Sequence, residues 1–239
     1  MPPLYIIQRH HELLELWRSR KDRNLNLLHV DFHDDLRGWL IERGKNRIFR
    51  LAEQPLDPGN FLGYAVMEGI LARIRWVRGR HGGRAYDSGI VRYETDLAAQ
   101  AYRLQQAFRK GPTWPLDFEE HIFEDWPGLS EPCRLDLDWD FFASYEYSPE
   151  SIEKRLKAFL NKIVEMAPEE IYLCYSPEYV HPSRELFELA IEELKTRFGA
   201  QPEWPGGLFL DEIETARPEI PVPNLKSRLI RTLRKRNIF

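Results

Sequence analysis

One segment of this chain carries acids and histidines at a spacing that suits metal binding. Residues 29–35 read His-Val-Asp-Phe-His-Asp-Asp and follow an apolar stretch that should form a buried strand. In extended backbone alternate residues share a face, so Asp31, His33 and Asp35 should point the same way. His29 is two residues before Asp31 and should share its face, but it lies within the strand. It could be a core residue or a neighbour that supports the ligands.

A second acidic segment, residues 136–140, reads Asp-Leu-Asp-Trp-Asp and also follows an apolar stretch. Asp136 and Asp138 should share a face of this strand. Asp140 could lie beyond the end of the strand. Carboxylates that converge from both segments would repel one another unless protons or cations neutralise them. Oxygen ligands with one or two imidazoles suit Mn²⁺, and Zn²⁺ or Fe²⁺ less well. The alternative is that both segments hold solvated loop acids at strand ends.

The surrounding sequence indicates alternating strands and helices. We expect strands at residues 4–7, 26–30, 134–141 and 171–175, and helices at 11–19, 61–77, 95–110, 149–166 and 182–198. Residues 113–132 are rich in Pro and Trp and are expected to be irregular. This alternation predicts one α/β domain over residues 1–239, in three layers, with a mainly parallel sheet and helices on both faces. Ligands of such sheets bind beyond the carboxyl ends of the strands, where both acidic segments fall.

The composition excludes several classes of protein. Charged residues make up 30% of the chain with a net charge of −4, which does not indicate a nucleic-acid binder. Cys133 and Cys174 are far apart and suit neither a disulfide framework nor a zinc ribbon, so a cytoplasmic location is expected. Neither a signal peptide nor an apolar run that could span a membrane is seen. The basic tail, residues 224–239, is expected to be a solvated helix or a dock for an acidic leader peptide.

Several segments, in family order, resemble an arginase-like family within the arginase and histone deacetylase superfamily. They are residues 8–14, 29–36, 59–61, 135–142 and, more loosely, 176–182. The Asp-Phe-His-Asp-Asp of residues 31–35 resembles the Asp-x-His-x-Asp motif of the superfamily, and residues 136–138 resemble its later Asp-x-Asp. Some members of this family are peptide arginases, which convert arginine side chains of ribosomally made precursor peptides to ornithine and release urea.

The resemblance implies two Mn²⁺ ions in one site. One ion would bind His10, Asp31, Asp35 and Asp136, and the other would bind His33, Asp31, Asp136 and Asp138. His11 is the alternative to His10 as the upstream histidine ligand. Asp35 would also act catalytically, by orienting the hydroxide between the ions.

The sequence departs from the family at the position of a proton shuttle. Arginases read Gly-Asn-x-His-Gly there, whereas residues 59–63 read Gly-Asn-Phe-Leu-Gly, with Leu62 in place of the histidine. His181 is the expected substitute, with His81 as the alternative. Asn60 matches an asparagine that contacts the α-carboxylate of free arginine and would here bind peptide main chain, or would serve only as a turn residue. Glu178 is expected to hold the guanidinium by paired hydrogen bonds.

These features together predict a manganese-dependent peptide arginase acting on a ribosomally synthesised precursor peptide. A zinc-dependent amide hydrolase with one ion is an alternative, although Asp138 favours two ions. A non-catalytic binding protein with a structural metal site is another, and Leu62 is its best support.

Overall fold

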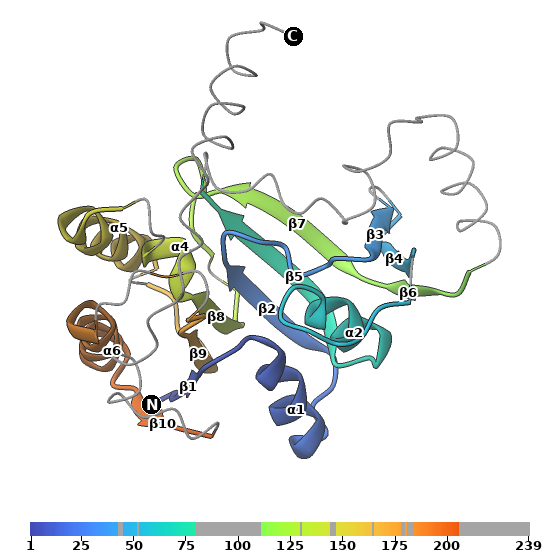
Figure 1. The fold of residues 1–239 in the computed structure, drawn as a ribbon, viewed down its shortest axis with the longest axis horizontal. Coiled ribbons are helices and arrows are strands. Elements are labelled where there is room, and N and C mark those ends of the chain that lie inside the picture. The colour runs from blue at the N-terminus through green and yellow to red at the C-terminus, as the bar shows by residue number, and fades with distance from the viewer. Residues whose placement is uncertain are drawn as a thin grey trace, which may run out of the picture.

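In the computed structural model the chain builds a three-layer α/β fold, with a parallel sheet between two layers of helices (Figure 1). The structure describes residues 1–42, 45–51, 53–79, 111–129, 131–143, 147–163, 165–177, 180 and 184–205. The expected helix at 95–110, the basic tail and the residues His81, Glu178 and His181 lie outside the described residues. Within the described part, no helix is long and apolar enough to cross a membrane.

The central sheet has the strand order β10-β1-β9-β8-β2-β5-β7, and every neighbouring pair is parallel. Its strands are β1 (Pro3–Ile7), β2 (Leu25–Val30), β5 (Leu71–Arg78), β7 (Asp117–Ile122), β8 (Arg134–Asp138), β9 (Glu170–Cys174) and β10 (Gln201–Glu203). Because β2 and β8 are direct neighbours, the two acidic segments leave the sheet side by side.

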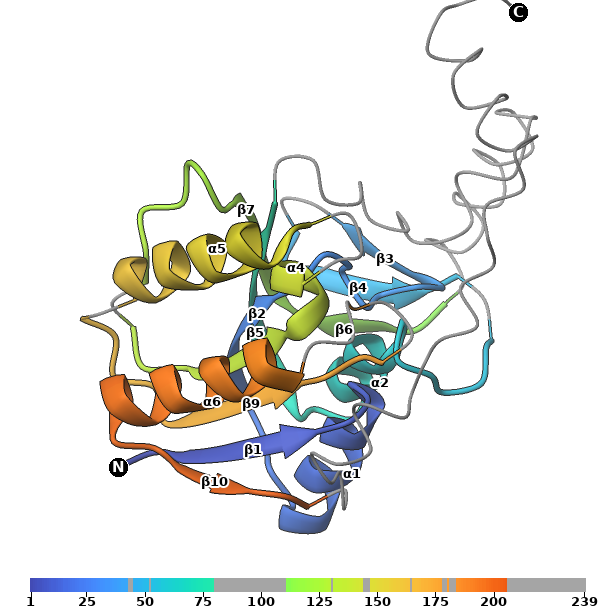
Figure 2. The same cartoon turned by 60° about the vertical axis from the view of Figure 1, so that its left-hand side comes forward.

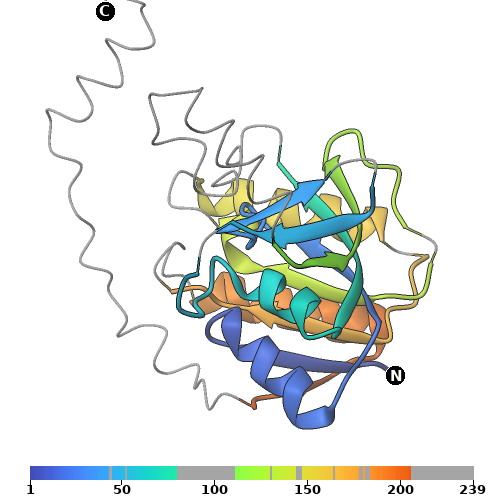
Figure 3. The ribbon, with the colours of Figure 1, turned by 90° about the vertical axis from the view of Figure 1, so that its right-hand side faces the viewer.

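Helices cover both faces of this sheet. They are α1 (His11–Arg20), α2 (Phe61–Met67), α4 (Trp139–Ala143), α5 (Pro149–Lys162) and α6 (Arg184–Phe198). The α1 and α2 helices lie on one face, and α4, α5 and α6 lie on the other (Figures 2 and 3). The predicted three-layer, mainly parallel architecture is therefore confirmed.

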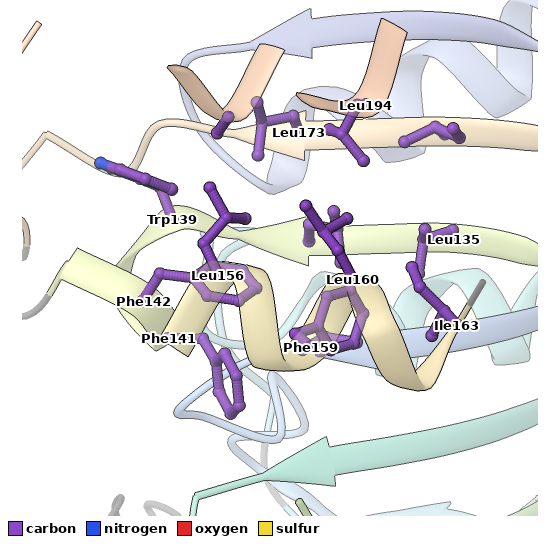
Figure 4. Close-up of a cluster of buried hydrophobic side chains, with 14 of the residues drawn as sticks. Leu135, Trp139, Phe141, Phe142, Leu156, Phe159, Leu160, Ile163, Leu173 and Leu194 are labelled. Atoms are coloured by element: carbon purple, nitrogen blue, oxygen red, sulfur yellow. The ribbon is translucent and has the colours of Figure 1, made fainter. Parts of the chain in front are cut away.

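Each face of the sheet has its own hydrophobic core. On the α5 and α6 face, Leu135 and Leu173 of the strands pack with Phe159, Leu160 and Leu194 of the helices (Figure 4). Since alternate strand residues point to opposite faces, the same strand β8 turns its acids toward the α1 and α2 face. That second core holds residues of α1 and α2, among them Leu13, Trp17, Phe61 and Leu62.

Three expected elements differ from the structure. The helix expected at 61–77 ends at Met67, and β5 begins at Leu71 after a turn in which Gly69 has a φ of +70°. Residues 113–132, expected to be irregular, contain the short strand β6 (Thr113–Pro115) and the edge strand β7. The strand expected to reach residue 141 ends at Asp138, where α4 begins.

A small antiparallel sheet packs beside α2. It has the order β3-β4-β6, with β3 (Trp39–Glu42) and β4 (Arg47–Arg50) forming a hairpin that follows the first acidic segment. Trp39 is buried and meets Tyr64 of α2 and Trp114 of β6 edge to face, at centroid distances of 5.7 and 5.5 Å. The hairpin is thereby held next to the loop that carries the acids.

A side chain at Gly63 of α2 should lower stability, because a Cβ there would overlap the indole of the buried Trp39. We expect Gly63→Ala to lower the free energy of unfolding by about 1–3 kcal/mol, the usual cost of overpacking a core. The matched control is Gly59→Ala, whose Cβ would lie 3.6 Å from Asp57 Oδ1, an ordinary contact. Urea denaturation of both variants measures the difference, and equal stabilities would contradict the packing described here.

Candidate metal centre

The two acidic segments meet at the carboxyl ends of β2 and β8. His29 on β2 lies opposite Asp136 on β8 in the strand register. A third contributor, His10, comes from the turn between β1 and α1 and is 2% exposed. Its ring stacks on Phe61 of α2, with the centroids 5.4 Å apart. The sequence left open whether His10 or His11 is the ligand, and His10 is the one that reaches the acids.

His10 lies among the carboxylates of both segments. Its Nδ1 is 3.0 Å from Asp35 Oδ2, 3.3 Å from Asp31 Oδ2 and 3.2 Å from Asp138 Oδ2. Its Nε2 is 3.3 Å from Asp136 Oδ1. Three distant parts of the chain are therefore brought together in one buried cluster.

The second histidine, His33, lies on the other side of Asp31. Its Nδ1 is 3.6 Å from Asp31 Oδ1, whereas His10 faces Asp31 Oδ2. The two oxygens of Asp31 thus face different histidines, as a carboxylate that bridges two ions must do. With this contact, the structure brings together all the residues that the sequence predicted as metal ligands.

Buried polar atoms without hydrogen bonds show that the cluster fits metal ions. In the described part of the chain, the atoms without a hydrogen-bond partner include His10 Nε2, Asp31 Oδ2, Asp35 Oδ2, Asp136 Oδ1 and Asp140 Oδ1. An unsatisfied buried polar group costs about 1–3 kcal/mol. The donor atoms of His10, Asp31 and Asp35 lie within 4.8 Å of one another, as do those of Asp31, His33 and Asp140. Divalent cations bound among these groups would satisfy the unpaired atoms.

The raised pKa values of Asp138 and Asp140 also indicate a need for positive charge. Burial, followed by repulsion from Asp140, raises the pKa of Asp138 well above its ordinary value. Burial and repulsion from Asp31 raise the pKa of Asp140 to about 6. Burial disfavours the charged form of His33, but the hydrogen-bonded acids Asp140 and Asp31 outweigh it and raise its pKa to about 12. Bound cations would offset this repulsion and keep the acids ionised.

Neighbouring groups orient the predicted ligands. His29 is fully buried, and its Nδ1 is 2.8 Å from Asp136 Oδ2. The Ser176 hydroxyl donates to Asp138 Oδ2 at 2.8 Å, and the His33 amide donates to Asp31 Oδ1 at 2.8 Å. Of these, the sequence indicated only His29, through its parity with Asp31. Ser176 lies on a separate strand end and could be found only through its loosely matched segment.

Unusual backbone geometry occurs at two of these residues. Asp35 and Ser176 have φ values of +49° and +48°, a region that costs non-glycine residues energy. Such conformations cluster at functional sites, where the surrounding structure enforces them. In this case they turn Asp35 and Ser176 toward the cluster from the ends of β2 and β9.

A cavity of about 360 Å³ opens beside the cluster. On one side it is lined by His10, His33, Asp35, Asp138 and Ser176. The other side is formed by the loop before α2 and the turn after the first acidic segment, with Asp34, Arg37, Asp57 and Gly59. Arg37 pairs with Asp57 across this side. A small polar group could therefore reach the predicted ligands from outside.

The remaining predicted site residues have different outcomes. Asn60 is buried; its Oδ1 accepts from the Asp57 amide at 2.9 Å, and its Nδ2 donates to the Pro55 carbonyl at 2.7 Å. This is the turn role that the sequence left open, and a role in substrate binding stays a prediction. Leu62 is fully buried in the core under α2. The assignments of Glu178 and His181 stay predictions, because neither residue is described.

Removing the imidazole of His29 should weaken the centre without breaking the fold. We expect His29→Asn to lower Mn²⁺ affinity about 10- to 100-fold, because groups that orient metal ligands typically contribute this much. The matched control is His121→Asn, at a half-exposed histidine of the edge strand β7 paired with Glu119. Calorimetric titration with Mn²⁺ measures both variants. Unchanged affinity in His29→Asn would show that Asp136 needs no such support.

Comparison with known proteins gives only distant likenesses. No protein-family model matches the chain, and no curated protein does. Among solved structures, proclavaminate amidino hydrolase from Streptomyces clavuligerus is 13% identical with a TM-score of 0.46, covering 82% of this chain and 62% of that one. Arginase from Medicago truncatula is 10% identical with a TM-score of 0.45, covering 82% and 58%. A T. brucei arginase-like protein triple mutant bound with Mn²⁺ is 12% identical with a TM-score of 0.42, covering 82% and 62%. The chain thus spans less than two thirds of the length of each.

Proposed function

We propose that this chain is a manganese-dependent hydrolase that converts arginine side chains of a precursor peptide to ornithine and releases urea. The observation that carries the proposal is the position of His10 among the acids of two separate segments, beside an open cavity. Such a centre has the donors for a pair of cations and leaves one side accessible to a substrate.

The donor set supports two ions and favours manganese. Carboxylate oxygens outnumber imidazole nitrogens in the centre, and oxygen-rich ligation suits Mn²⁺ better than Zn²⁺. Asp31 presents one oxygen to each histidine, which supports its predicted role as a bridge. When bound, a pair of divalent cations supplies activated water at neutral pH and positive charge against the charge that develops during attack.

The residues of the chain would provide the rest of the mechanism. Asp35 lines the cavity, and its Oδ2, which makes no hydrogen bond in the described structure, could accept one from the attacking water and so orient it. The substrate guanidinium is cationic and planar, so a carboxylate would hold it by paired hydrogen bonds, a role proposed for Glu178. His181 is proposed to give the proton that the leaving amine needs, since Leu62 cannot do so.

The environment of Asn60 supports a peptide over free arginine. Its side chain is used within its own loop, so it is not placed to contact the α-carboxylate of a free amino acid. An arginine inside a peptide has no free carboxylate to recognise. The Arg37–Asp57 pair lines the same side of the cavity and offers polar groups to a peptide main chain.

A single-zinc amide hydrolase is the second candidate. The buried thiol of Cys174 lies with His10 and Asp138 in one group of close donor atoms, and sulfur ligands favour zinc. This reading leaves the separate group of Asp31, His33 and Asp140 without a function, which is why we favour two ions.

The test is incubation of the Mn²⁺-loaded protein with an arginine-containing peptide, followed by mass spectrometry and a urea assay. We expect a mass decrease equal to cyanamide, the difference between arginine and ornithine residues, with a matching amount of urea. The same peptide with lysine in place of arginine is the control, and free L-arginine is the parallel substrate. Deacetylation of an acetyl-lysine peptide by zinc-loaded protein, without urea from any arginine substrate, would overturn the proposal in favour of the second candidate.

A further inference from the structure

Asp140 lies in the centre although the family pattern assigns it no role there. It is the second residue of α4 and is only 3% exposed. Its Oδ2 is 3.2 Å from His33 Nδ1, and its Oδ1 is buried without a hydrogen-bond partner in the described structure. A buried carboxylate with an unused oxygen, aimed at a predicted ligand, requires an explanation.

The path of the chain explains how Asp140 reaches His33. Strand β8 ends at Asp138, and the backbone turns into α4 at Trp139. The Asp140 amide then donates to Asp138 Oδ1 at 3.0 Å, which ties the Asp138 carboxylate to the backbone at the start of α4. Because the strand has ended, Asp140 is displaced sideways toward the loop after β2, where His33 lies.

Asp138 lies closer to the other histidine. Its Oδ2 is 3.2 Å from His10 Nδ1 and accepts the hydroxyl of Ser176. The close donor groups divide in the same way, because Asp138 occurs with His10, whereas Asp140 occurs with Asp31 and His33. The carboxylate that accompanies His33 in this structure is therefore that of Asp140.

We propose that Asp140 is a metal ligand that binds, together with Asp31 and His33, the second ion of the centre. This rests on the metal centre of the proposed function and not on its guanidine substrate. Asp140 adds a fifth buried carboxylate to those of Asp31, Asp35, Asp136 and Asp138. Two divalent ions neutralise four of them, so the fifth leaves one negative charge, which favours a cationic substrate in the cavity.

The experiment compares Mn²⁺ binding by the wild-type protein, Asp140→Asn and Asp140→Ala. We expect the wild type to bind two Mn²⁺ ions and to give the electron paramagnetic resonance signal of a spin-coupled pair. The variants should keep one ion, with the signal of isolated Mn²⁺, and affinity for the second should fall at least about 100-fold, the upper range for groups that only support a ligand. The alanine variant is included because an asparagine oxygen could still bind a metal.

The matched control is Asp34→Asn, which removes an acid next to His33 in the first acidic segment that belongs to none of the close donor groups of the described residues. It should retain the coupled pair. A coupled signal and two equally tight ions in both Asp140 variants would overturn the proposal. So would a lower melting temperature of the metal-free variants with an unchanged increase on adding Mn²⁺, since that marks a purely structural role. A wild type that binds the pair but cleaves no arginine peptide overturns only the proposed function and leaves Asp140 as a ligand.

Discussion

Asp31→Asn should remove the paired ions and lower hydrolysis of an arginine peptide by at least about 1000-fold. The reason is that, among the described residues, only Asp31 faces both His10, through Oδ2, and His33, through Oδ1. Loss of a metal pair removes several kcal/mol of transition-state stabilisation, and each 1.4 kcal/mol is a factor of ten in rate. Urea release under saturating peptide measures the effect.

The same substitution should leave the fold intact. Asparagine has the shape of aspartate, and its oxygen can still accept the His33 amide that now donates to Asp31. The control is Asp117→Asn, at the edge of the sheet, where the carboxylate pairs with Arg73 and Arg75. That variant should keep its metal content and activity. If Asp31→Asn kept the coupled ions and full activity, the assignment of the bridge would be wrong.

Removal and return of the metal should change the stability of the protein strongly. A ligand that binds only the folded state at 100 times its Kd adds about 2.7 kcal/mol per site. In a chain of this size that corresponds to a melting temperature raised by roughly 5–10 °C per site. The buried acids of the centre are the physical cause, because without cations they repel one another or must be protonated.

Differential scanning calorimetry of chelator-treated protein, with and without added Mn²⁺, measures this increase. The matched sample is the Asp31→Asn variant, whose melting temperature should respond little to Mn²⁺. Mg²⁺ should stabilise the wild type less, because it dehydrates reluctantly and demands near-ideal octahedral geometry. An equal response of the wild type and the variant would mean that the stabilising ions bind elsewhere.

The ligands that lie on one strand end could be predicted because strand alternation is a local rule. Asp136 and Asp138 on β8 follow it, whereas Asp31, His33 and Asp35 lie in the loop after β2 ends at Val30, where Asp35 has a φ of +49°. The convergence of both segments could be predicted from the parallel sheet, whose strands end at a common edge. The structure confirms that the two segments meet at this edge.

Asp140 could not be placed in this way. Alternation of apolar and acidic residues continues through residues 135–140, so the pattern predicted a strand as far as residue 141. The strand ends at Asp138 because Trp139, Phe141 and Phe142 pack in the core under α5 and α6, which is a tertiary effect. The boundary that moves Asp140 beside His33 therefore depends on helices later in the chain.

The choice between His10 and His11, and the contact of His29 with Asp136, also needed the folded chain. His10 and His11 are adjacent at the start of a helix, so the sequence does not show which of them is the ligand. In the folded chain, the stacking of His10 on Phe61 selects His10. The helix expected at 61–77 failed for a related reason, since its apolar residues suit both a helix and a buried strand. Gly69 marks the break between α2 and β5.

Elemental analysis of protein dialysed against Mn²⁺ and then freed of unbound metal tests the central claim most directly. The arrangement of His10, His33 and their surrounding acids predicts two Mn²⁺ ions per chain in the wild type, as expected of a two-metal site. Protein that retains no Mn²⁺, or that holds a single zinc ion which manganese does not replace, would contradict the binuclear centre on which the proposed hydrolysis depends.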